Sequence, residues 1–127
     1  MADITGFSHV ALTVRDIARS KAFYADVFGL QAAVDTDDLF IGAHPSTGLL
    51  FGLRKHEGQT GDEFTHLRIG LDHISFAVSG KDELEGWQRR FDELGVDHSP
   101  IEQSQFGWHL NFRDPDNIPL ELFVLEM

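Results

Sequence analysis

The 127-residue sequence contains no cysteine, which excludes disulfide bonds and thiolate metal sites. It also contains no apolar run near the roughly 20 residues that a membrane helix requires. Residues 1–4 show neither the basic stretch nor the apolar block of a signal peptide. These absences lead us to expect a cytoplasmic protein that does not associate with membranes.

Basic residues are scarce. The sequence has 10 Lys and Arg and 21 Asp and Glu, which gives a formal net charge of −11. No segment of the sequence is enriched in basic residues. Such a surface repels phosphate backbones, so we expect no nucleic-acid partner. The hydrophobic content of 42% is typical of a globular protein, and the length fits a single compact domain over residues 1–127.

The chain carries an internal repeat. Residues 9–14, HVALTV, match residues 73–78, HISFAV, and both segments alternate as a strand with one buried face does. Each is followed by a helical pattern that ends at a glycine, Gly29 or Gly95, and Asp16 is the expected N-cap of the first helix. The predicted inner stripes of the two helices comprise Phe23, Tyr24 and Val27, and then Leu84, Trp87, Phe91 and Leu94.

Three further strand-like runs follow each helix, and a turn at residues 114–117 joins the last two. The runs cover residues 31–37, 39–44 and 49–54 in the first half, and residues 98–103, 108–113 and 120–125 in the second. The sequence therefore predicts an α+β fold of two βαβββ modules, with cupped, mostly antiparallel sheets and helices outside. Module 1 covers about residues 5–56, the linker about 55–68, and module 2 about 69–127.

One face of each leading strand carries a histidine followed by small residues. These are His9, Ala11 and Thr13 in the first module, and His73, Ser75 and Ala77 in the second. Small side chains cannot fill the space in front of a sheet, so we expect them to line a substrate pocket. Taken singly, a histidine at the start of a strand is more often a hydrogen-bonded structural residue than a ligand.

A carboxylate stands in the apolar last strand, at Glu121. Burial of an ionised carboxylate is unfavourable without a cation, a proton or hydrogen-bond donors. Together with His9 and His73 it would form a facial set of two histidines and one carboxylate, which leaves coordination positions open. The alternative is that Glu121 is a charged residue at a strand edge and faces water.

The sequence resembles the vicinal oxygen chelate superfamily of glyoxalases, bleomycin resistance proteins and extradiol dioxygenases. The similarity covers nearly the whole chain, in residues 7–14, 22–30, 71–78 and 112–123. The resemblance implies a metal ion held by His9, His73 and Glu121. A fourth ligand position in the family falls near Leu50 or Phe51, and neither side chain can bind a metal.

The strand at residues 108–113 places His109 and Asn111 on one face. We predict Asn111 in the pocket, at a position where extradiol dioxygenases usually carry a tyrosine. His109 is the candidate acid or base, since imidazole titrates near neutrality; the alternative is a surface histidine.

These features favour an enzyme that uses a divalent metal ion (Fe, Mn, Zn or Ni) to bind a small substrate through vicinal oxygens, in lyase, isomerase or dioxygenase chemistry. The alternative is a metal-free protein that sequesters a small molecule or drug, of the bleomycin resistance type. The resemblance also implies a homodimer.

Overall fold

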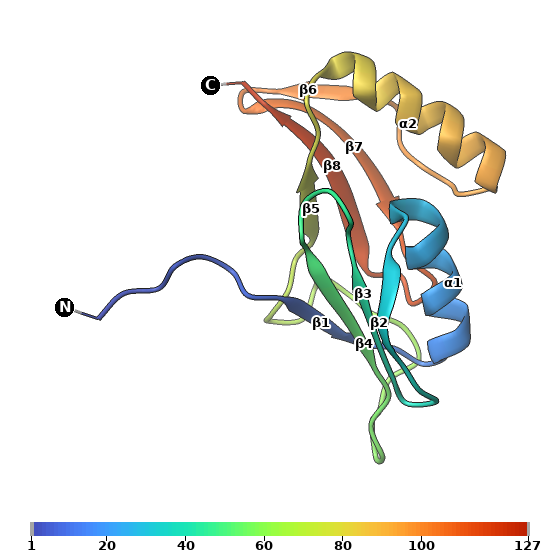
Figure 1. The fold of residues 1–127 in the computed structure, drawn as a ribbon. Coiled ribbons are helices and arrows are strands. Elements are labelled where there is room, and N and C mark those ends of the chain that lie inside the picture. Colours follow the sequence, from blue (N-terminus) through green and yellow to red (C-terminus); the bar gives the residue numbers. More distant parts are fainter. Residues whose placement is uncertain (1, 127) are drawn as a thin grey trace. The chain divides into compact units, whose positions relative to one another are not determined.

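The computed structural model describes residues 2–126 and divides into two compact units, one ending at Asp62 and the other beginning at Glu63. Each unit contains one helix and one four-stranded sheet (Figure 1). The first unit consists of β1 (Val10–Thr13), α1 (Ile17–Phe28), β2 (Gln31–Asp35), β3 (Leu39–Ala43) and β4 (Leu50–Arg54). The second consists of β5 (Ile74–Ala77), α2 (Lys81–Leu94), β6 (Glu102–Ser104), β7 (Gly107–Arg113) and β8 (Pro119–Leu125).

The two sheets have the same topology. Their strand orders are β1-β4-β3-β2 and β5-β8-β7-β6. In each sheet the first strand pairs in parallel with the last, and the other pairs are antiparallel. The predicted α+β fold of two βαβββ modules is therefore confirmed.

The strand predicted at residues 98–103 is the least accurate of the strand predictions. Only Glu102–Ser104 forms β6, and His98 makes an isolated bridge to Phe112. Pro100 lies between these two pairings and has no N–H to donate, which interrupts the ladder.

Helix α1 begins and ends as predicted. The Asp16 side chain accepts a hydrogen bond from the Arg19 N–H at 3.1 Å, and Gly29 closes the helix in the left-handed conformation at φ 68°. Tyr24 and Val27 are buried, whereas Phe23 is only half-buried. The Tyr24 ring lies 4.7 Å from the ring of Phe51 on β4, so it packs the helix against the sheet.

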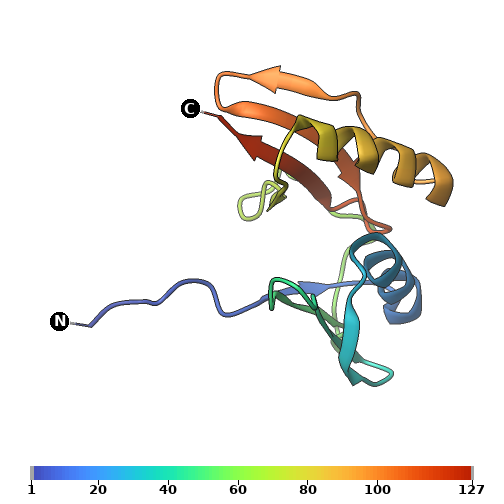
Figure 2. The ribbon, with the colours of Figure 1, turned by 45° about the horizontal axis from the view of Figure 1, so that its top comes forward.

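Helix α2 lies across one face of its own sheet (Figure 2). Leu84 and Phe91 are fully buried, and the Phe91 ring lies 4.5 Å from that of Phe112 on β7. Trp87 is half-buried, and the prediction that Leu94 belongs to the inner stripe is wrong, because Leu94 is 42% exposed. Three residues beyond Phe91 correspond to a rotation of about 60° away from it around the helix, and the helix ends there.

The predicted turn at residues 114–117 is present and well braced. The buried Asp114 carboxylate accepts hydrogen bonds from the N–H groups of Asp116 and Ile118 at 2.8 and 2.9 Å. Asn117 takes the left-handed conformation at φ 67°, and Arg113 donates to its carbonyl oxygen at 3.2 Å. The turn thereby fixes where β8 begins, and with it the position of Glu121.

Among residues 2–126, neither helix has the length and apolar character needed to cross a membrane.

Candidate metal and substrate site

The open face of each sheet, opposite its helix, carries the predicted site residues. Along β1 and the two residues that flank it, His9, Ala11 and Thr13 are exposed while Leu12 and Val14 are buried. His73, which precedes β5, and Ser75 and Ala77 within it are exposed, and the intervening residues are half-buried. The predicted alternation of faces is therefore confirmed in both units.

Within the second unit, the structure brings His73 and Glu121 together. The His73 Nε2 atom lies 3.6 Å from Glu121 Oε1, and the Glu121 side chain is only 15% exposed. This separation is too long for a hydrogen bond. It is close to the roughly 3 to 3.5 Å expected between two ligand atoms that share an ion at metal–ligand distances of about 2.0 to 2.2 Å. The separation therefore fits a shared metal ion, and it equally fits an ion pair between Glu121 and a protonated His73.

A polar hollow of about 280 Å³ surrounds this pair. The register places Asn111 directly opposite Glu121 on the neighbouring strand, and both residues line the hollow. His66 and Arg113 also line it, and neither was predicted as a site residue. His66 lies outside the strands, where no periodic pattern could indicate the direction of its side chain.

In both units the residue before the histidine holds its Nδ1 atom. Asp72 Oδ1 lies 2.7 Å from His73 Nδ1, and Ser8 Oγ lies 2.9 Å from His9 Nδ1. The hydrogen bond with His73 lowers the pKa of the Asp72 carboxyl below its ordinary value of 3.8, so the carboxylate is ionised and can only accept. An acceptor at Nδ1 favours the tautomer whose proton is on Nδ1, and that tautomer leaves the Nε2 lone pair for a metal ion.

Sequence reasoning missed Asp72 and Ser8, although an alignment of the two repeats places them at equivalent positions. The available signal was a hydrogen-bonding residue immediately before each repeat histidine.

The third predicted ligand belongs to the other unit. His9 immediately precedes β1 in the first unit, whereas His73 and Glu121 lie in the second unit. Within each unit, over residues 2–126, no three His, Asp or Glu side chains are grouped so as to hold a metal ion.

The strand pairing also identifies the counterpart of Glu121 in the first unit. Ser75 pairs with Glu121, and the repeat equivalent of Ser75 is Ala11, which pairs with Gly52. The equivalent position is therefore Gly52, adjacent to the predicted Leu50 or Phe51. Glycine has no side chain to bind a metal, so the inference that this position supplies no ligand is unchanged.

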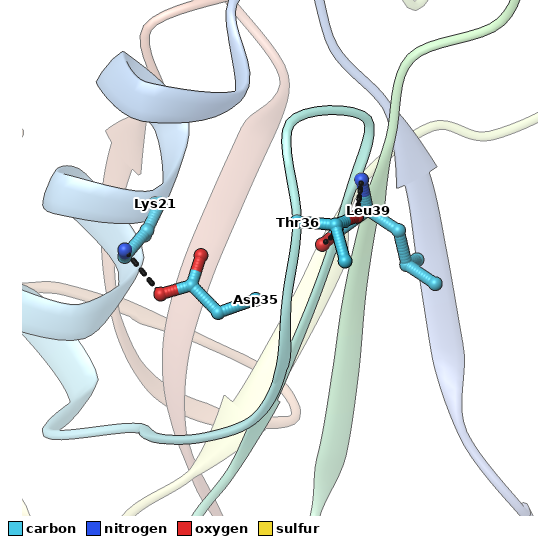
Figure 3. A network of polar contacts seen from close by, with 4 residues as sticks. All are labelled: Lys21, Asp35, Thr36 and Leu39. Atoms are coloured by element: carbon cyan, nitrogen blue, oxygen red, sulfur yellow. Dashed lines mark hydrogen bonds and ion pairs between the residues drawn. The ribbon is translucent and has the colours of Figure 1, made fainter.

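The first unit has an apolar hollow where the second has a polar one. Its volume is about 170 Å³, and it is lined by His9, Ala11, Leu39, Ile41, Leu50, Gly52 and Arg54. The turn that leads into Leu39 is fixed by hydrogen bonds between Thr36 and Leu39 (Figure 3). In the same view, Lys21 of α1 pairs with Asp35 of β2, and this ion pair ties the helix to the edge strand.

His109 lies on the same face of its sheet as Asn111 and Glu121. Its ring stacks on that of Phe123, with centroids 6.1 Å apart and planes 6° from parallel. Its Nε2 atom lies 3.8 Å from Glu102 Oε2 on β6. Glu102 was missed because it stands in a three-residue strand whose sequence has no alternation.

The model of the Glyoxalase/Bleomycin resistance protein/Dioxygenase superfamily matches residues 6–122. The crystal structure of a domain of this type from Frankia sp. EAN1pec has a TM-score of 0.86 and 37% identity, covering 98% of this chain and 100% of that one. The uncharacterized protein YaeR of Escherichia coli is 31% identical, over 91% of this chain and 92% of YaeR.

Two further relatives carry descriptions of what they bind or do. The trivalent organoarsenical cleaving enzyme of Bacillus sp. is 27% identical, over 92% of this chain and 71% of that enzyme. The fosfomycin resistance protein FosX of Listeria monocytogenes, in complex with Mn(II) and sulfate, shares the fold with a TM-score of 0.76 and 24% identity, covering 98% of this chain and 94% of FosX. The repeated βαβββ topology and these similarities lead to one conclusion: the chain belongs to the glyoxalase/bleomycin resistance protein/dioxygenase superfamily, with the vicinal oxygen chelate fold.

Proposed function

We propose that the protein is an enzyme that uses a divalent metal ion, held by His9, His73 and Glu121, to bind a small substrate through two adjacent oxygens. The observation that carries the proposal is the 3.6 Å separation of His73 Nε2 and Glu121 Oε1, with the opposite ring nitrogen of His73 held by Asp72. Relatives described as a cleaving enzyme and as a Mn(II) complex support it.

The donor set fits Fe, Mn, Zn or Ni, because imidazole and carboxylate bind all four and no thiolate is present. Two histidines and one carboxylate leave coordination positions open for substrate oxygens. A metal ion bound there supplies Lewis-acid stabilisation of negative charge on a substrate oxygen.

The chain's own residues would orient the substrate and move protons. Asn111, opposite Glu121, offers an amide that can donate to a substrate oxygen or accept from a hydroxyl. His109 would transfer a proton through Nε2, and Glu102 at 3.8 Å would orient its ring. Stacking on Phe123 restricts the imidazole to one plane, which favours a defined direction of proton transfer.

We further propose that the two modules act as one domain and that the protein forms a homodimer. Phe7 and Ile69 are 99% and 109% exposed, so either residue is accessible to a second copy of the chain. Sedimentation of a particle of about 29 kDa at micromolar concentration is the expected result for two 14.3 kDa chains.

The second candidate function is metal-free sequestration of a small molecule, and the apolar lining of the first unit's hollow favours it. Elemental analysis of untagged protein purified without chelator separates the candidates. We expect about one equivalent of metal per chain, lost in His73→Ala and retained in the matched control His56→Ala, whose histidine lies on an exposed loop. A wild-type protein that binds no metal after incubation with any of the four ions would contradict the proposed enzyme.

Activity is tested with the loaded protein against catechols, 2-oxoacids and adducts of 2-oxoaldehydes with thiols. Turnover that requires metal and is lost in Glu121→Gln supports the enzyme. Tight binding without turnover of any class supports sequestration.

A further inference from the structure

The apolar hollow of the first unit contains a single permanent charge. Leucine, isoleucine, alanine and glycine make up most of the lining, with His9 at one end and Arg54 at the other. The register places Leu50 and Arg54 four residues apart along β4, which corresponds to about 13 Å. A ligand in this hollow would lie on apolar side chains between an imidazole and a guanidinium.

Arg54 is available to a ligand. Within residues 2–126, its guanidinium makes no ion pair and no hydrogen bond, although the chain carries 21 acidic residues. Its backbone is fixed, because its carbonyl oxygen accepts from the Val14 N–H at 2.9 Å and it pairs with Thr13 and Leu39 on the neighbouring strands. Arg54 is exposed at the end of β4, so its guanidinium can meet an anion at the rim of the hollow and form the charge-assisted hydrogen bonds that guanidinium and carboxylate groups make.

The volume limits the apolar part of the ligand. The hollow measures about 170 Å³. A cavity of about 150 Å³ is large enough to hold a benzene molecule. The guanidinium presents two parallel N–H groups that match a carboxylate, and one cation balances one negative charge. A ring or a branched chain of similar size, with one carboxylate, therefore matches the hollow in volume, polarity and charge.

We propose that this hollow binds a small organic carboxylate, with its apolar body on Ile41 and Gly52 and its carboxylate on Arg54. The inference deepens the proposed function and rests on it for one point: the reacting oxygens would lie toward His9. It assigns substrate selection to the first unit.

The test uses metal-free wild-type protein, so that it does not depend on the metal site. The probes are 3-phenylpropanoate and its neutral amide, 3-phenylpropanamide, titrated while backbone amide NMR signals are recorded. We expect the carboxylate to shift signals of β1, β3 and β4 and to bind about tenfold or more tightly than the amide. Equal affinity of the two probes, or shifts confined to other strands, would overturn the inference.

Variants identify the group that binds the carboxylate. We expect Arg54→Gln to weaken carboxylate binding by about tenfold, to the level of the amide, and to leave amide binding unchanged. Lys55→Gln is the matched control, because it removes a cation at the next position, which is exposed beyond the end of β4. A loss of equal size in Lys55→Gln would mean that net charge, and not Arg54, attracts the probe, and would refute the assignment.

The same titration with His73→Ala separates this inference from the proposed function. Carboxylate binding that survives in His73→Ala while metal binding is lost supports both. If the wild-type protein binds the carboxylate but binds no metal, the proposed metal-dependent activity is refuted and the proposed carboxylate site is supported.

Discussion

The two units share one topology and differ at one strand position in a way that separates their chemistry. The last strand of the second unit carries Glu121, and the equivalent position in the first unit is Gly52. A half-buried carboxylate beside a histidine makes a polar hollow, whereas glycine leaves an apolar one. Under the two proposals above, two of the three metal ligands lie in the second copy of the unit, and the third lies in the first copy together with the ligand hollow, while the strand order stays the same.

The largest expected effect concerns whether the two units are independent. Phe51 and Phe91 are fully buried core residues of the first and second unit. Truncating either to alanine should lower the free energy of unfolding by about 3–5 kcal/mol. Each unit has about half of the chain and would be marginal alone, so we expect the whole protein to unfold in one transition.

Two spectroscopic probes distinguish the units in that experiment. Both tryptophans, Trp87 and Trp108, lie in the second unit, so their fluorescence reports its unfolding, while circular dichroism reports both units. In urea, Phe51→Ala should move both signals to the same lower midpoint. A tryptophan transition that stays at the wild-type midpoint would show that the units unfold separately.

Removal of a ligand in the second unit should have the next largest effect. His73→Ala and Glu121→Gln are expected to weaken metal binding by about 100-fold or more, since a three-ligand site loses one of its protein bonds. Affinity is measured by competition with a chromogenic chelator. Unchanged affinity in both variants would remove the second unit from the metal site.

The hydrogen bonds to Nδ1 should show a smaller effect that differs between units. Replacement of a residue that orients a metal ligand typically weakens metal binding by about 10- to 100-fold. We expect Asp72→Ala to lie at the lower end of that range and Ser8→Ala to have less effect, because an ionised acceptor holds an imidazole N–H more firmly than a hydroxyl does. An equal effect of the two variants would contradict this ranking. Nitrogen chemical shifts of the metal-free protein check it directly, since His73 should show a protonated Nδ1.

The smallest expected effect on stability concerns the polar contact that joins each helix to the rest of its unit. His98 donates from Nε2 to Asp92 of α2 at 2.8 Å and from Nδ1 to the Ser99 carbonyl oxygen at 2.7 Å. The hydrogen bond to Ser99 and then that to Asp92 raise the His98 pKa above 6.5, with Asp97 adding to the effect. Because the folded pKa is raised, the stabilisation is complete below about pH 6.5 and is lost as the pH rises through the folded value.

We therefore expect His98→Gln to be destabilised by less than about 1 kcal/mol at pH 6, the scale of a solvent-accessible ion pair, and to match the wild type at pH 9. The corresponding ion pair in the first unit joins Lys21 to Asp35 and contains no imidazole. Lys21→Met should therefore show the same small effect at both pH values in urea unfolding. A deficit of His98→Gln that persists at pH 9 would contradict the protonated contact.

Much of the fold could be predicted because its signals are local. Alternation in residues 9–14 and 73–78, the N-cap at Asp16 and the turn at residues 114–117 each depend on neighbours a few residues away, and the structure confirms them. The bounds of the short strand β6 and the burial of Leu94 were predicted wrongly, because both depend on which residues of other elements pack or pair with them.

The sequence alone indicated the family, the repeat and the faces of the segments at residues 9–14 and 73–78, because strand periodicity and the repeated motifs are properties of chain order. Only the tertiary structure decided that Gly52 is the counterpart of Glu121, that His73 and Glu121 lie 3.6 Å apart, and that Arg54 completes an apolar hollow. These facts depend on strand register and on side chains that converge from separate strands, and register is set by pairing between strands rather than by the order of residues within one.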